Sequence, residues 1–196
     1  TLGGIATVLA DRGRAVARFE DKTFFAAAFG GANNDGPTLL ETSRQVFNTT
    51  DGTKAASGAA ISVTTVNAGR AAMRKRTSID GNLLDIMPAV MLVGPDSELT
   101  AQQLLAPIQA QQTSTVNPFS GQMELVVSAR ISGNAWYLFA DPADAPVFVY
   151  GFLDGFEAPR VRIEEPFGQQ GTALTIEHDF GVGAVDFRGG YKNAGA

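Results

Sequence analysis

The chain has 196 residues, of which 44% are hydrophobic and 18% charged, and its formal net charge at pH 7 is −5. These values are typical of a folded protein with one domain or two small ones, and they exclude wholesale disorder. No cysteine is present, which excludes disulfide frameworks, thiolate nucleophiles and cysteine-ligated zinc. Because affinity for a phosphate backbone comes mainly from Lys and Arg, the negative charge argues against free nucleic acid as a direct ligand.

The first predicted element is a long amphipathic helix over residues 2–29. This stretch has no proline, and its large apolar residues fall near spacings of three and four while charged residues occupy other faces. Residues 30–37 then gather glycine, asparagine, aspartate and proline, which tolerate turn conformations and end the helix. The chain begins inside this helical pattern, at Thr1 and not at a methionine, so we expect native sequence to be missing upstream.

Residues 38–60 have the composition of a loop, with many Thr, Ser and Gly and few large apolar side chains. We expect at most a short strand or helix around residues 46–47, and we expect the segment to be mobile. A second helix follows, because Ser62 or Thr64 can accept hydrogen bonds from its first free amides; this helix ends before Thr77.

Short elements alternate with turns in the rest of the chain. Between residues 122 and 131 apolar and polar residues alternate strictly, which predicts a strand with one buried face. The other predicted elements are a turn at 80–81, a buried strand at 88–93, a Gly-Pro stop at 94–95, a helix capped by Asp96 or Ser97 that runs through Leu105, and strands at 135–140, 147–153, 160–165, 173–179 and 182–188. Helices and strands are segregated along the chain, which favours the α+β class.

His178 is the one imidazole of the chain and the first candidate for catalysis. A serine triad with Asp179 would need a serine brought close by the fold, and no Gly-x-Ser-x-Gly motif suggests one. Alternation instead places His178 on the same strand face as Ile176, near the end of a sheet. We therefore expect a structural role for His178 and no catalytic residue in the chain.

Two further groups of residues suggest ligand sites, and in both a structural role is favoured. Gly181 and Gly183 lack the spacing of a dinucleotide fingerprint or a P-loop, so they are expected to permit a bulge or a close approach of strands. Carboxylates that could form an acid pair or hold a cation match no calcium loop and are expected at the solvated surface; they are Glu164, Glu165, Asp141 and Asp144. We expect no cofactor and no metal.

Charged and aromatic clusters offer candidate contact surfaces. The basic cluster near the end of the second helix is expected to be a solvated helix face, with an inward patch near packaged DNA or a subunit contact as alternatives; it comprises Arg70, Arg74, Lys75 and Arg76. The C-terminal phenylalanines are expected to be mostly core, with some as anchors of subunit interfaces; they are Phe139, Phe148, Phe152, Phe156, Phe167, Phe180 and Phe187.

Three runs in the last third of the chain carry a resemblance to a known family. They are the Trp-Tyr-Leu-Phe-Ala-Asp-Pro run of residues 136–142, the Phe-Leu-Asp-Gly turn of 152–155, and the His-Asp-Phe-Gly-Val-Gly-Ala-Val-Asp-Phe-Arg-Gly-Gly-Tyr-Lys-Asn run of 178–193. Together they resemble the closing part of tailed-bacteriophage major capsid proteins, in particular the Mu-like prophage major head subunits. The buried strand at 88–95 and the helix after it are similar too, although such a unit is common.

The resemblance implies the tailed-phage capsid fold, with residues 2–29 as its spine helix. It implies a peripheral subdomain of residues 1–60 plus 146–196 and an axial subdomain of residues 61–145, and an upstream arm and extended loop that are absent here. The implied function is a structural subunit of a phage or prophage icosahedral head, which self-assembles into the shell that encloses DNA. On this resemblance the chain is not an enzyme.

The implied partners are copies of the chain in pentamers and hexamers, together with scaffold, portal and head-decoration proteins, with packaged DNA only an indirect partner and no membrane. The implied location is the virion capsid, assembled in the cytoplasm of the bacterial host. Two alternatives stay open: an encapsulin-like compartment or another virion assembly protein, and a small hydrolase or binding module that uses His178.

Overall fold

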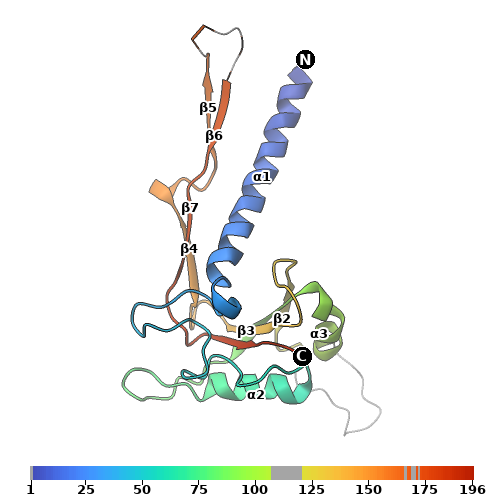
Figure 1. Cartoon of the computed structure of the whole chain (residues 1–196), viewed down its shortest axis with the longest axis vertical. Coiled ribbons are helices and arrows are strands. Elements are labelled where there is room, and N and C mark those ends of the chain that lie inside the picture. The colour runs from blue at the N-terminus through green and yellow to red at the C-terminus, as the bar shows by residue number, and fades with distance from the viewer. Residues whose placement is uncertain (1, 107–120, 166, 169–170, 172) are drawn as a thin grey trace.

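The computed structural model describes residues 2–106, 121–165, 167–168, 171 and 173–196. The molecule consists of a base and an arm that rises from it (Figure 1). The base holds a four-stranded sheet with two helices, α2 (Val63–Arg74) and α3 (Glu98–Leu105). The arm consists of the long helix α1 (Leu2–Ala28) and of two ribbons, β4 (Phe148–Phe152) with β7 (Phe180–Ala184) and β5 (Arg160–Glu164) with β6 (Ala173–Glu177). This mixture of helix and sheet agrees with the α+β class predicted from the sequence.

The sheet of the base has the strand order β2-β1-β3-β8. Its strands are β1 (Pro88–Val93), β2 (Glu124–Val127), β3 (Trp136–Ala140) and β8 (Gly190–Asn193). Strand β2 runs parallel to β1, and the other neighbours are antiparallel. Side chains on both faces of β3 are buried, so this central strand separates two hydrophobic clusters.

The two clusters divide the molecule's core between the base and the foot of the arm. One cluster packs α2 and α3 against the sheet through Met73, Leu104 and Trp136. The other packs the end of α1 against the opposite face through Phe29, Phe47 and Tyr137. In the second cluster the rings of Phe29 and Tyr137 meet edge to face with centroids 4.8 Å apart, an arrangement that aromatic pairs favour. The arm is therefore rooted in an aromatic core.

Helix α1 confirms the predicted long amphipathic helix and ends where the sequence indicated. A Cβ atom on Gly30 would lie 2.1 Å from the carbonyl oxygen of Ala26, so only glycine fits at this close approach. Asn33 and Asn34 then adopt left-handed conformations with φ of 60° and 56°, which asparagine tolerates better than most residues.

The segment of residues 38–60 forms no long element but contributes to the core. Val46 and Phe47 are buried, and Thr53 is buried as well, with its hydroxyl donating to the carbonyl of Val46 at 2.8 Å. Within the same segment, the side-chain oxygen of Asn48 accepts a hydrogen bond from the amide of Asp51 at 2.8 Å. The mobility expected for these residues stays a prediction.

The first residues of α2 and α3 lie where the sequence predicted them, but only α2 is capped by a side chain. Ser62 caps α2 as predicted, in a capping box in which its hydroxyl accepts from the amide of Thr65 and the Thr65 hydroxyl accepts from the amide of Ser62. Ser97 holds the N-cap position of α3, but its side chain makes no capping hydrogen bond. A 3-10 turn over Pro95–Ser97 leads into α3 instead.

The predicted strand at 122–131 is confirmed only for residues 124–127 and is wrong on either side of them. Strand β2 pairs with β1 only as far as the partners Val93 and Val127, because β1 ends there and Ser128 begins a turn. In that turn the Ile131 amide donates to the carbonyl of Ser128. Val127 is 36% exposed and not buried as its face was predicted to be, because β2 lies at the edge of the sheet.

The end of the chain differs in detail from the expected strand at 182–188. The ordered strand there is β7, which begins two residues earlier, at Phe180, and ends at Ala184. Strand β8 was not predicted, because its sequence Gly-Tyr-Lys-Asn lacks apolar alternation. All four of its residues are buried all the same, and Lys192 is only 2% exposed.

The prediction of a solvated basic face on α2 is wrong for Arg76. Its side chain is buried and donates to the carbonyls of Phe187, Arg188 and Gly52, so it ties three segments together. Burial lowers the pKa of Arg76 to about 10, partly offset by the charge of Asp186. The sequence does not distinguish this arginine from its exposed neighbours on the helix.

Replacement of Arg76 by alanine should destabilise the base, because it removes the three part-buried hydrogen bonds that this side chain donates to the carbonyls of Phe187, Arg188 and Gly52. We expect a loss of about 3 kcal/mol in the free energy of unfolding, measured by urea denaturation with circular dichroism. The matched control is Arg74→Ala, which breaks only the exposed ion pair with Asp85 and should cost less than about 1 kcal/mol. Equal losses in the two variants would contradict the role given to Arg76.

Candidate assembly surface on the arm

The hairpin of β5 and β6 has one apolar and one polar face. Its register places Val161 opposite Ile176 and Ile163 opposite Leu174, so these four side chains share a face. Arg162 faces Thr175 on the other side of the hairpin, where Arg162 also pairs with Glu177 at 3.3 Å. The apolar face is the side that looks toward α1.

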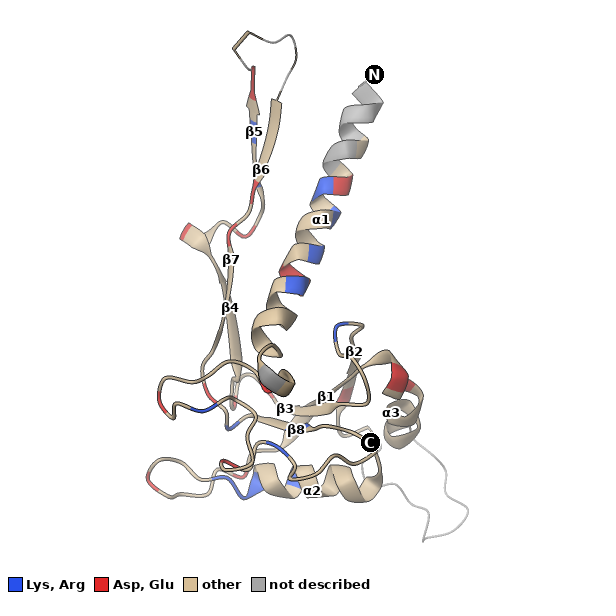
Figure 2. Cartoon of the chain, in the orientation of Figure 1, with Lys and Arg blue, Asp and Glu red and all other residues tan. Residues whose placement is uncertain are grey.

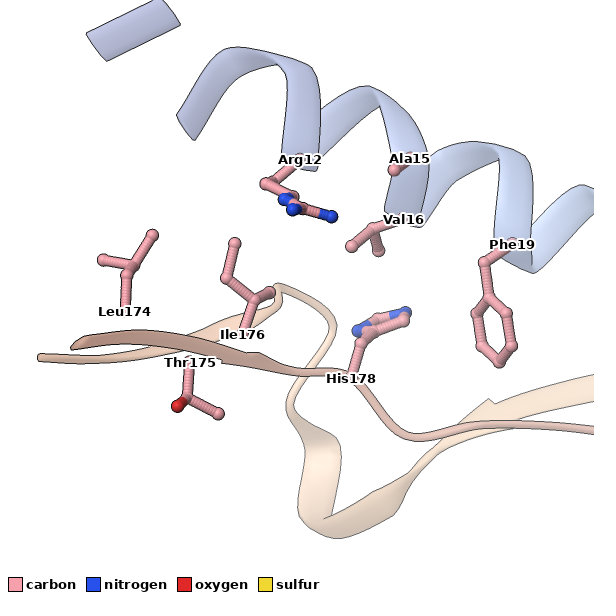
Figure 3. A pocket seen from close by; sticks show the side chains of 8 residues that line it. All are labelled: Arg12, Ala15, Val16, Phe19, Leu174, Thr175, Ile176 and His178. Atoms are coloured by element: carbon pink, nitrogen blue, oxygen red, sulfur yellow. The ribbon is translucent and has the colours of Figure 1, made fainter. Parts of the chain in front are cut away.

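A groove of about 520 Å³ separates this face from the helix. Leu174, Ile176 and His178 point from the strand side toward α1, whereas Thr175 points away (Figure 3). The helix contributes Val16 and Phe19 on its side of the groove. Arg12 brings one cation to a groove that is otherwise mostly apolar.

The hairpin does not bury its apolar face against the helix. Ile163 is 68% exposed, and Val161, Leu174 and Phe19 are exposed too. An isolated two-stranded hairpin is marginally stable in water, and contiguous exposed apolar side chains mark interaction sites. The arm therefore has the properties of a surface that another polypeptide covers.

His178 lines the end of the groove that is nearest to Phe19. Its Nε2 atom lies 2.6 Å from the Oε1 atom of Glu20 on α1, its ring packs 5.7 Å from that of Phe152, and its side chain is only 4% exposed. The Nδ1 atom is buried without a hydrogen-bond partner among the described residues. Since neither ring nitrogen contacts a hydroxyl there, the geometry is that of a structural link between helix and ribbon and not of a catalytic dyad.

Glu20 was not singled out in the sequence as the partner of His178. The two residues are 158 positions apart, and the signal in the sequence is weak: a lone carboxylate on the helix face that also carries Val16. Only the folded ribbon brings them together.

Charges on the arm are unevenly distributed (Figure 2). Residues 154–179 carry two arginines and six carboxylates, which are Asp154, Glu157, Glu164, Glu165, Glu177 and Asp179. Helix α1 exposes Arg14, Arg18 and Lys22 at intervals of four residues, which places them on a common face. The acidic hairpin and this basic face of α1 are thus complementary in charge.

The glycines of β7 occupy regular positions in the ribbon. Gly181 pairs with Gly151 and Gly183 with Val149, without a shift in register, so the predicted bulge is wrong. A Cβ atom on Gly183 would meet its nearest neighbour, a methyl of Val149, at 3.9 Å, an ordinary contact. Among the described residues, no close approach therefore explains this glycine.

The carboxylates suggested as an acid pair or cation site are all exposed, as expected for solvated surface. Glu164 and Glu165 lie at the end of β5, and Asp141 and Asp144 lie in the turn after β3. The Asp141 side chain accepts from the amide of Ala143 within that turn. Over residues 2–106, 121–165, 167–168, 171 and 173–196, no group of three or more potential metal ligands comes together.

The basic cluster and the phenylalanines separate into buried and exposed members. Arg70 donates to the side chain of Gln122 at 3.0 Å, and Lys75 lies exposed at the end of α2.

Phe156 and Phe167 are exposed, which suits contacts with other chains. The other C-terminal phenylalanines are partly buried; they are Phe139, Phe148, Phe152, Phe180 and Phe187.

None of the helices in the described part of the chain is both long and apolar enough to cross a membrane. The long helix α1 carries seven charged residues, four basic and three acidic, which are Asp11, Arg12, Arg14, Arg18, Glu20, Asp21 and Lys22.

An uncovered apolar face on an elongated arm is typical of a surface that contacts another polypeptide. The sequence model of the family described as phage capsid protein matches residues 1–193. The chain belongs to this family and is a structural, non-enzymatic protein of the phage head. The resemblance to phage major capsid proteins is thereby confirmed, and the Mu-like subtype stays a prediction. A search of curated proteins finds no match.

Replacement of His178 by alanine should loosen the ribbon from α1, because it removes the contact with Glu20 and the ring packed on Phe152. We expect a loss of about 2 kcal/mol in the free energy of unfolding and faster amide hydrogen exchange in β6 and β7. The control is Asp179→Ala, which breaks only an exposed ion pair with Arg160. Unchanged exchange in the His178 variant would refute the link.

Proposed function

We propose that this chain is the major subunit of a phage or prophage icosahedral head, of the Mu-like type, and that it self-assembles into the shell that encloses DNA. The observation that carries this proposal is the uncovered apolar face of the β5–β6 hairpin, because a face of this kind is stable only when another surface covers it. The family supports a shell protein, and the arm supplies a surface that contact with a neighbouring subunit would bury.

In this proposal the chain has two subdomains of the capsid fold. Residues 1–60 plus 146–196 form the peripheral subdomain, with α1 as its spine helix, and residues 61–145 form the axial subdomain. The proximity of α1 to the ribbons supports the first grouping. Strand β8 hydrogen-bonds to β3 across the boundary, so the two subdomains share one sheet.

The mechanism is repeated association through unlike surfaces. The acidic, half-apolar hairpin of one copy packs beside the basic face of the α1 helix of the next, and contacts of this heterologous kind close into pentamers and hexamers when the rotation between copies is right. Each contact is modest, and the shell gains stability because every subunit makes several. Scaffold, portal and decoration proteins would bind the assembled rings, and packaged DNA is only an indirect partner.

The proposed place of action is the virion capsid, after assembly in the cytoplasm of the bacterial host. The hydrolase alternative has no support from the geometry, since His178 contacts Glu20 and Phe152. An encapsulin-like compartment would share the surface features described above, and electron microscopy together with the genomic neighbourhood would distinguish it.

Replacement of Ile163 by aspartate should prevent assembly without unfolding the chain, because Ile163 is exposed in the isolated subunit. Burial of an isoleucine contributes about 2 kcal/mol, so the concentration required for assembly should rise by at least about tenfold. The measurement is sedimentation velocity with electron microscopy of the products, and circular dichroism reports whether the variant is folded.

The matched control is Arg162→Ala, one residue away on the polar face of the same strand. This variant should assemble at nearly the concentration of the unmodified chain. If Ile163→Asp also forms shells at that concentration, the hairpin face is not an assembly surface. If the full-length protein forms no shells under any condition of salt and concentration, the proposed function itself fails.

A further inference from the structure

Strand β4 leaves a free hydrogen-bonding edge on the arm. Among the described residues it pairs with β7 alone, and no backbone hydrogen bond joins its other edge to the chain. The run of residues 147–153 around it contains no charge and no proline, no bulge interrupts its pairing, and Tyr150 at its centre is 61% exposed. Natural proteins normally protect such edges with charges, prolines or bulges, because an unprotected edge pairs with other strands.

The register shows which backbone groups are free. The amide of Val185 donates to the carbonyl of Val147, so these two opposed residues form a hydrogen-bonded pair of the ribbon. Such pairs alternate along an antiparallel ladder, which makes Val149 with Gly183 and Gly151 with Gly181 the next ones. The amide and carbonyl groups of the intervening residues therefore point away from β7; these residues are Phe148, Tyr150 and Phe152.

The sequence of β4 is complementary to itself when reversed. In an antiparallel pair of two β4 strands centred on Tyr150, each Phe148 lies opposite Phe152 of the other copy, and each Val149 lies opposite Gly151. The missing side chain of Gly151 gives room to the valine across from it. Phe148, Tyr150 and Phe152, whose amide and carbonyl groups point away from β7, are also the residues that this pairing would join by hydrogen bonds. The register of the pair therefore uses the backbone groups that are free.

We propose that β4 pairs with β4 of a second copy about a two-fold axis through Tyr150, which joins the two ribbons into one four-stranded sheet. We choose a second copy as the partner because β4 can pair with an antiparallel β4, with each phenylalanine opposite a phenylalanine. The edge also carries no charge that would favour a different protein as the partner. This inference rests on the proposed assembly function and adds to it an isologous contact, distinct from the heterologous contact of hairpin and helix.

The surroundings of the strand are compatible with this contact. Phe148 packs against Phe24 on the α1 side, and Tyr150 packs against Phe180 on the same face of the ribbon. A two-fold axis perpendicular to the sheet places the α1 helices of both copies on this side, each above its own strand β7. The two β7 strands are about 14 Å apart, because three strand spacings separate them. Packed helices need only 8–10 Å between their axes, so the two helices have room. The opposite face, formed by the small residues of the ribbon, stays open.

The carboxylates near Tyr150 do not oppose the contact strongly. Glu20, Asp21 and Glu157 line a hollow beside Tyr150, and the axis would bring two copies of this hollow near each other. Glu20 contacts His178, and Asp21 forms an ion pair with Arg130 at 2.8 Å. The charge of Asp21 is thus paired within its own chain, and Glu20 is held there by a hydrogen bond.

Cysteine cross-linking tests the contact and its register, because the chain has no cysteine of its own. Val149→Cys and Gly151→Cys are prepared as separate chains, and a new Cβ atom on Gly151 would meet nothing within 4 Å. In the proposed pair, position 149 of one copy faces position 151 of the other at a Cα distance of about 4.5 Å, which suits a disulfide. Identical positions lie about 7–8 Å apart, too far for one.

The expected result is that oxidation of the mixed variants gives disulfide dimers in yield about tenfold above that of either variant alone. Equal yields in all three samples, or no mixed dimer at the concentration where the unmodified chain associates, would overturn the proposal. Shells without mixed dimers would refute this contact and leave the proposed function standing. Mixed dimers of the full-length protein without shells would support the contact and refute the proposed function.

Charge substitution gives a second readout if a cysteine variant fails to fold. Tyr150→Lys and Tyr150→Glu each place like charges opposite each other at the axis, so each alone should lose the dimeric contact in sedimentation experiments. Mixing the two variants places lysine opposite glutamate and should restore it. Failure of the mixture to associate more strongly than either variant would contradict a two-fold axis at Tyr150.

Discussion

The arm of this protein is held to its base by a buried ammonium group. Lys192 on β8 donates to the carbonyls of Asn33 and Asn34 at 2.6 and 2.8 Å and to the carboxylate of Asp35 at 2.8 Å, while Lys54 donates to the other oxygen of Asp35 at 2.6 Å. Burial lowers the pKa of Lys192, against the raising effect of Asp35. Removal of one partner would leave an uncompensated buried charge, so the end of α1 is fixed to the last strand of the sheet.

This anchorage explains how the arm can remain uncovered. The aromatic cluster around Phe29 and the ammonium of Lys192 fix the helix at its foot, and the contact of His178 with Glu20 fixes the ribbon halfway along it. Beyond that point the hairpin and the helix diverge, and the side chains between them stay in contact with water. The fold thus presents apolar surface at a defined position, as a subunit of a phage head requires.

Local signals in the sequence predicted the elements that depend on neighbouring residues. The period of α1, the Ser62 cap and the strand at Pro88–Val93 are all specified within a few positions. Contacts between distant segments were not predictable: the burial of Arg76, the strand around Lys192 and the pairing of His178 with Glu20 depend on residues more than 100 positions apart. For the hairpin, the sequence showed only that apolar and polar residues alternate along its strands. It did not show that the apolar face is exposed, because that depends on which segment of the fold lies across from it.

The length of α1 has a mechanical consequence. Its 27 residues span about 40 Å, and the part that precedes the Glu20 contact extends for about 27 Å, so a bend of about 10° at Glu20 moves the free end by about 5 Å. The helix therefore acts as a lever, by which one subunit shape can meet neighbours at slightly different angles while the sheet beneath it stays rigid.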